Sequence, residues 1–133
     1  MNASTAVITE PMSDLTATST ATAAFGTGMA EIGTALFALL RRGDHFISSS
    51  YLFGNTNSLF NTFATHGIEV TFVDATSSDA VAAAIQPNTR LVFVETIANP
   101  RTQVSDLVGI GGLCREHNLI YFVDNTMTTP YLF

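Results

Sequence analysis

Acidic and amide side chains follow the most hydrophobic stretches of this chain. Glu95 and Asn99 come just after the run "LVFV" that begins at Leu91, and Asp124 follows "YFV". A carboxylate at the end of a buried strand needs hydrogen-bond donors or a cationic partner. Asp124 can therefore cap a loop, or it can hold the protonated nitrogen of a heterocyclic ligand. Asn99 can form a turn with Pro100, or its amide can reach a ligand oxygen.

A second chemical feature is the tripeptide Gly26-Thr27-Gly28, which leads into a predicted helix. The free N–H groups and the dipole at a helix N-terminus favour an anion such as phosphate. The tripeptide is neither G-x-G-x-x-G nor a Walker A sequence, so taken alone it predicts an ordinary tight turn. Phe53 presents a similar choice between a core position and stacking on a planar ring.

The remaining reactive side chains do not form a catalytic or metal-binding pattern. His45, His66 and His117 are scattered and lack metal-ligand spacing, so no metal site is predicted. Cys114 lies beside Leu113 on the apolar side of its predicted helix, which favours a core role over a nucleophilic one. No residue of this chain is therefore nominated as catalytic.

The elements that must position these groups alternate between strands and helices. This order, with short loops, predicts an α/β fold with a mainly parallel sheet and flanking helices. Residues 1–19 show no clear period and are expected to form a loose arm or a poorly formed helix. The first helix is expected to carry Arg41 and Arg42 in its last turn and to stop at Gly43. The predicted strands are 20–25, 45–50, 68–74, 89–96 and 119–125, and the predicted helices are 29–43, 55–67, 77–87 and 104–118.

Ligands of open parallel α/β sheets bind at the carboxyl ends of the strands. Small or polar residues follow four of the five predicted strands. We therefore expect Thr27, Ser49, Glu95 and Asp124 to lie along one edge of the sheet.

Composition narrows the possible partners. The chain has 133 residues, of which 47% are hydrophobic and 12% charged, and its net charge is -6. The charged share is about half the usual value of roughly 25%. The negative balance argues against nucleic acid, and no apolar run is long enough for a membrane span. A single Cys and no recognisable signal peptide favour a cytoplasmic protein. All five basic residues are Arg, so the chain contains no lysine.

Four ordered segments resemble one enzyme family. The segments "GTGMAEIGTALFALLRRGDH", "SSSYLFGNTNSLFNTFATHGIEVTFVD", "TRLVFVETIANPRTQVSDL" and "YFVDNTMTTPYLF" are similar to the large-domain core of the transsulfuration enzymes. These are the Cys/Met-metabolism group of fold-type-I pyridoxal-phosphate enzymes, such as cystathionine γ-synthase, O-acylhomoserine sulfhydrylase and methionine γ-lyase. The resemblance covers about residues 20–133.

The resemblance implies a pyridoxal 5′-phosphate site. The backbone N–H groups of Gly28 and Met29 would bind the phosphate. Phe53 stands where many members have a Tyr stacked on the pyridine ring, so stacking is kept and the hydroxyl is lost.

Polar groups would surround the rest of the ring. Asn99 would contact the ring hydroxyl, and Asp124 would pair with the pyridinium nitrogen and make the ring an electron sink. Thr126 would support Asp124, and Glu95 would line the same edge.

The resemblance also implies what an intact member contains. Members hold the cofactor as a Schiff base to a Lys shortly beyond the "VDNT" segment, carry a C-terminal domain, and form homotetramers. Their substrates are small amino acids, activated homoserines or thioethers, which undergo γ-replacement or elimination. We expect residues 20–133 to be a partial cofactor-binding domain that lacks the Lys segment and the C-terminal domain. Two alternatives are a non-catalytic truncated product or pseudoenzyme, and an unrelated nucleotide-binding α/β module.

Overall fold

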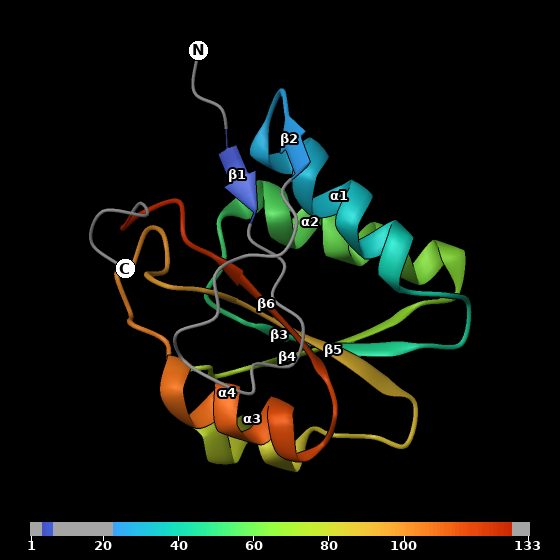
Figure 1. Ribbon diagram of the computed structural model, residues 1–133, viewed down its shortest axis with the longest axis vertical. Helices are drawn as coiled ribbons and strands as arrows, with labels where there is room; N and C mark the ends of the chain where they lie inside the picture. The colour runs from blue at the N-terminus through green and yellow to red at the C-terminus, as the bar shows by residue number, and fades with distance from the viewer. Residues whose placement is uncertain (1–3, 7–22, 129–133) are drawn as a thin grey trace.

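The computed structural model describes residues 4–6 and 23–128 of the chain. Its centre is a four-stranded sheet with strand order β4-β3-β5-β6, in which every pair of neighbours is parallel. Figure 1 shows one layer of helices on each side of this sheet. The expected α/β fold with a mainly parallel sheet is confirmed. The strands are β3 His45–Ser49, β4 Glu69–Val73, β5 Thr89–Glu95 and β6 Ile120–Asp124.

The helices cover the two faces of the sheet in pairs (Figure 1). Helices α1 (Gly28–Leu39) and α2 (Gly54–Phe63) cover one face, and a short 3-10 helix, η1 (Ala64–His66), extends α2. Helices α3 (Ser78–Ala83) and α4 (Leu107–Glu116) cover the other face.

Two hydrophobic cores follow from the alternation of side chains along each strand. Phe46, Phe93 and Phe122 point from three neighbouring strands toward α1 and α2. Val92 and Val94 point the opposite way, toward α3 and α4. Burial of both faces explains why the strand "LVFV" shows no polar alternation.

Phe93→Ala is expected to cost about 3–5 kcal/mol of unfolding free energy. Phe93 is 0% exposed. Its ring centroid lies 4.9 Å from that of Phe60 and 5.2 Å from that of Phe122. Urea denaturation measures the loss, with Val108→Ala as the control because Val108 is 89% exposed. The control should stay within about 0.5 kcal/mol of the parent chain. Equal losses for both variants would contradict the assigned core.

The N-terminal region differs from its prediction. Strand β1 (Ser4–Ala6) pairs antiparallel with β2 (Ala23–Phe25), and the two form a small sheet separate from the parallel one. A strand therefore lies within residues 1–19, where a loose arm or helix was expected. The rest of that range lies outside the described residues. The first predicted strand does exist at Ala23–Phe25, but it is not a member of the parallel sheet.

The prediction that α1 carries Arg41 and Arg42 in its last turn is wrong, because the helix ends at Leu39. Arg41 lies just beyond the helix and still interacts with its end. The Arg41 guanidinium donates to the carbonyl oxygens of Phe37 and Ala38 at 3.2 and 2.9 Å. A cation that binds the last carbonyls of a helix stabilises it without extending it.

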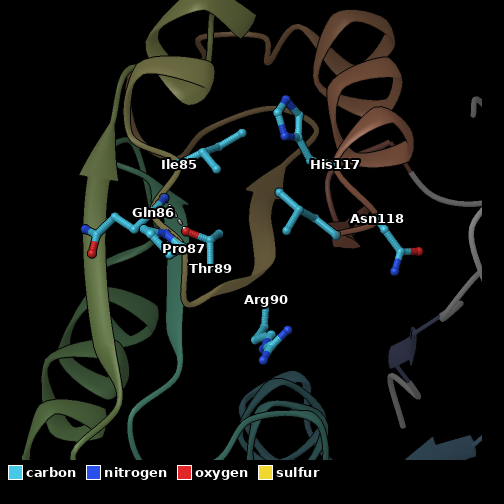
Figure 2. Close-up of a pocket in the computed structure, with 8 residues that line it drawn as sticks. Ile85, Gln86, Pro87, Thr89, Arg90, His117 and Asn118 are labelled. Atoms are coloured by element: carbon cyan, nitrogen blue, oxygen red, sulfur yellow. Dashed lines mark hydrogen bonds between the residues drawn. The ribbon is translucent and has the colours of Figure 1, made fainter.

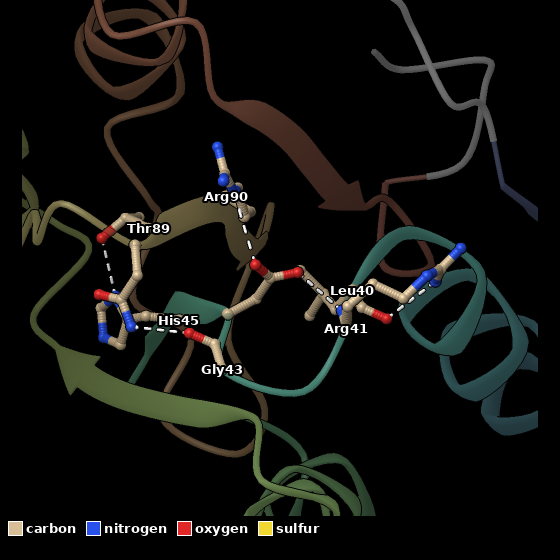
Figure 3. A network of polar contacts seen from close by, with 8 residues as sticks. Leu40, Arg41, Gly43, His45, Thr89 and Arg90 are labelled. Atoms are coloured by element: carbon tan, nitrogen blue, oxygen red, sulfur yellow. Dashed lines mark hydrogen bonds and ion pairs between the residues drawn. The ribbon is translucent and has the colours of Figure 1, made fainter.

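A polar network ties together the amino-terminal ends of the strands (Figure 3). The His45 side chain is 1% exposed, and its two ring nitrogens lie 2.8 and 2.9 Å from the hydroxyls of Thr89 and Thr71. Burial lowers the pKa of His45, which favours the neutral ring. Asp44 and Arg90 form an ion pair at 3.4 Å in the same network. These contacts fix the strands at the edge opposite to the acidic strand ends.

Candidate functional site

Strand register brings Glu95 and Asp124 together. The two residues are paired across β5 and β6 at the carboxyl ends of these strands. Phe93 and Phe122, two residues earlier on each strand, face α1 and α2. Because side chains alternate along a strand, Glu95 and Asp124 are on the same face of the sheet as these helices. The carboxyl edge therefore carries two acids on its α1 side.

The N-terminus of α1 lies at this edge. Thr27 is the N-cap residue, and its Oγ1 accepts a hydrogen bond from the Ala30 N–H at 3.1 Å. Within the described residues, the N–H groups of Gly28 and Met29 make no hydrogen bond, as is usual in the first turn of a helix. Glu31, in the same turn, lies near enough for the Asp124 charge to raise its pKa. The N-terminus of α1, with two N–H groups that have no acceptor among the described residues, thus lies near Asp124.

Hydrogen bonds hold one of the two carboxylate oxygens of Asp124. The backbone N–H and the hydroxyl of Thr126 both donate to Oδ1 of Asp124, at 2.9 and 2.6 Å. In the part of the chain that the structure describes, Oδ2 makes no hydrogen bond. The carboxylate is therefore oriented by Thr126 and retains an acceptor atom for a further donor.

Glu95 connects the end of β5 to the start of α2. Its side chain is 7% exposed, and Oε1 accepts a hydrogen bond from the Phe53 N–H at 3.0 Å. Burial raises the pKa of Glu95, the Phe53 hydrogen bond opposes this, and the charge of Asp124 adds to it. This bond fixes Phe53 beside the acidic edge. Phe53 is 47% exposed, so the residue is accessible to a ligand.

Asn99 lines a pocket of about 330 Å³ next to this edge. The Asn99 backbone also acts to lower the pKa of Glu95, so the Asn99 segment lies near this carboxyl. Arg101 lines the same pocket and was not nominated from the sequence. The available signal was its place two residues after Asn99, in a chain with few cations.

Ser49 lies at the carboxyl edge as expected, and Glu31 is a residue of this edge that the sequence did not predict. Side chains alternate along β3, so Ser49 points to the face of the sheet that α3 and α4 cover. There its Oγ accepts a hydrogen bond from the Tyr51 N–H at 3.1 Å. Glu31 was missed, although it is 7% exposed and close to Asp124. The signal was an acid next to Ile32 on the apolar stripe of α1.

A larger pocket, of about 470 Å³, lies at the opposite, amino-terminal edge of the sheet (Figure 2). None of the nominated residues lines it. The candidate site is therefore the carboxyl edge, where the oriented polar groups lie, and not the larger pocket. The lining residues are Ile85, Gln86, Pro87, Thr89, Arg90, His117, Asn118 and Leu119.

The described residues include no group of three or more His, Cys, Asp or Glu side chains that could hold a metal ion. They also include no helix that is long and apolar enough to cross a membrane. Cys114 is 2% exposed, and burial raises the pKa of its thiol to about 12, so it has the core role predicted for it.

Comparison with known proteins matches one family over the whole chain. The family model described as "Cys/Met metabolism PLP-dependent enzyme" matches residues 1–133. The chain is 41% identical over 110 residues to cystathionine β-lyase of Bacillus subtilis, covering 82% of this chain and 28% of that protein. It is 39% identical over 111 residues to L-methionine γ-lyase of Fusobacterium nucleatum, with the same two shares. A solved structure of O-acetylhomoserine sulfhydrylase from Wolinella succinogenes matches with a TM-score of 0.76 and 46% identity, over 80% of this chain and 30% of that one.

The chain spans less than a third of the length of these relatives. Their names describe different reactions, a β-lyase, a γ-lyase and a sulfhydrylase. The matches therefore identify a family and a shared segment, and they do not select one reaction.

Proposed function

Because the chain belongs to the Cys/Met metabolism family of pyridoxal-phosphate-dependent enzymes, we propose that its carboxyl edge binds pyridoxal 5′-phosphate. Membership of the family implies this cofactor. The observation that carries the proposal is Asp124, which Thr126 holds by Oδ1 while Oδ2 has no partner among the described residues. A protonated ring nitrogen supplies the donor and the positive charge that such an atom lacks.

The phosphate fits the N-terminus of α1. Two successive N–H groups, of Gly28 and Met29, have no acceptor within the described chain, and the helix dipole adds positive potential. Thr27 occupies the N-cap and leaves these two groups to an anion. The residues present therefore fit both charged ends of the cofactor.

The ring would lie between these two ends. Phe53 offers an exposed aromatic face, and Asn99 offers an amide at the adjacent pocket. When bound, the cofactor supplies an electron sink for amino-acid chemistry. The chain's own part is to hold the ring nitrogen in its protonated form with Asp124 and to fix the orientation of the ring.

For the whole protein we propose a transsulfuration reaction, either γ-replacement or elimination on an activated homoserine or a thioether amino acid. The family implies amino-acid substrates, and the names of the relatives support this class of reaction. A cytoplasmic homotetramer is the assembly we expect for such an enzyme. The absence of lysine favours a second candidate for this chain alone, namely cofactor binding without turnover.

The test is a calorimetric comparison of two ligands without an aldehyde, pyridoxine 5′-phosphate and pyridoxine. We expect the phosphorylated ligand to bind at least about tenfold more tightly, because only it reaches the N-terminus of α1. The unphosphorylated ligand is the matched control for the ring. Equal affinities would contradict the phosphate site, and no binding of either ligand would contradict the proposed function.

A further inference from the structure

Glu31 has a buried carboxyl group that no described residue satisfies. The side chain is 7% exposed, and its Oε2 is inaccessible to solvent and has no hydrogen-bond partner. It lies in the first turn of α1, next to Ile32 and four residues before Ala35, both of which are buried. An unpartnered buried carboxyl is costly, and a native protein retains one where a ligand or another group completes it.

The position of Glu31 links it to the acidic edge. Burial raises the pKa of Glu31 most, and the charge of Asp124 raises it further. The charge of Asp124 also raises the pKa of Glu95, so Asp124 interacts electrostatically with both glutamates. The elements β1, β2 and α2, which pack against α1, contain no titratable side chain, and the His66 ring and the Arg41 guanidinium contact the C-terminal part of α1 at Phe37 and Ala38. Among the described residues, no cationic side chain forms an ion pair with these three acids.

A group that completes Asp124 beside Glu31 must therefore donate a hydrogen bond, and a positive charge on it would lower the cost of ionising both acids. The described residues contain no group of these acids arranged to hold a metal ion. A protonated ring nitrogen has one N–H, which it can donate to Oδ2 of Asp124, while its positive charge also acts on the nearby buried carboxyl of Glu31.

We propose that Glu31 is a second carboxyl of the ring-nitrogen site, so that Asp124 and Glu31 together select a heteroaromatic ligand whose ring nitrogen is protonated. This inference rests on the proposed function. Asp124 is the direct partner of the nitrogen, and Glu31 acts as a positioning and specificity residue. A cation that neutralises Asp124 also removes the repulsion on Glu31, so ligand binding favours the ionised form of Glu31.

The effect of the Glu31 charge on binding can be measured separately with a pair of ligands. Pyridoxine 5′-phosphate is compared with its analogue in which a C–H replaces the ring nitrogen, so that phosphate contacts cancel. We expect Glu31→Gln to weaken binding of the nitrogen ligand on the order of tenfold relative to the C–H analogue. The effect should grow as the pH rises through the raised pKa of Glu31. Glu116→Gln, an exposed position on α4, is the control and should change neither ligand.

A second readout needs no ligand. Because the folded pKa of Glu31 lies above its unfolded value of about 4.5, its favourable contribution is complete below that value and is lost as the pH rises through the folded pKa. In urea denaturation, Glu31→Gln should therefore gain stability over the parent chain as the pH rises above about 4.5. Glu116→Gln should follow the parent at every pH.

The outcomes separate the two proposals. If the parent chain binds the nitrogen ligand and Glu31→Gln weakens both ligands equally, or neither, the role of Glu31 is overturned and the proposed function stands. If the parent binds neither ligand, the proposed function fails and the inference fails with it. If the urea midpoints of parent and Glu31→Gln do not diverge with pH, Glu31 is not the charged neighbour of Asp124 that we infer.

Discussion

Asp124→Asn is expected to weaken the binding of pyridoxine 5′-phosphate by roughly a hundredfold or more, which corresponds to about 3 kcal/mol. The amide keeps the size of the side chain and can still accept from Thr126 through its oxygen. It removes the negative charge that a protonated ring nitrogen requires. Calorimetric titration at constant salt measures the change, because phosphate binding at α1 also depends on ionic strength.

The chain contains a closely matched control for this substitution. Asp74 follows β4, and the N–H and hydroxyl of Thr76 donate to its Oδ1 at 2.9 and 2.6 Å. These distances equal those between Thr126 and Asp124. The two motifs lie at the ends of the two outer strands of the sheet. Asp74→Asn therefore repeats the local change on another strand, with the difference that Oδ2 of Asp74 also accepts from the Tyr51 hydroxyl at 3.2 Å.

Asp74→Asn should leave ligand affinity within about twofold of the parent chain. If both substitutions weaken binding equally, the loss reflects the loop motif, and Asp124 has no special role toward the ligand. If Asp124→Asn binds as tightly as the parent, the ring-nitrogen site is wrong.

The sequence predicted the sheet and the edge at which polar groups gather, because two physical patterns are local. Alternating strands and helices specify a parallel sheet, and the residues after each strand are then at its carboxyl edge. Glu95 and Asp124 follow this rule, and their pairing in register places them side by side. Gly28 lies at the start of α1 as predicted, although the strand before it, β2, is not part of the parallel sheet.

Contacts between distant segments could not be predicted from local pattern. The end of α1 depends on Arg41, which folds back onto its carbonyls. The pairing of β1 with β2 joins short segments without strong strand character. Glu31 lies on an apolar stripe, and only the packing of α1 against the sheet shows that Asp124 is its neighbour.

The chain is also expected to form no internal covalent adduct with pyridoxal 5′-phosphate. A Schiff base needs an amine that can lose its proton and attack the aldehyde, and the chain contains no lysine. Only the amine of Met1 remains. After incubation and borohydride reduction, mass spectrometry should find no modified internal residue. Release of a keto acid from an acyl-homoserine should be undetectable, because no side-chain amine is present to take part in proton transfer.

Two substitutions that exchange one cation for another give this experiment a positive and a negative control. Arg101→Lys places an amine in the pocket that Asn99 lines, and Arg115→Lys places one in the last turn of α4, on the other face of the sheet. With equimolar cofactor, we expect a reduced adduct at position 101 in far higher yield than at position 115, because binding raises the local concentration of the aldehyde. An adduct at an internal residue of the parent chain would contradict the prediction. Equal yields at the two engineered positions would show that the aldehyde reacts from solution and is not held at the carboxyl edge.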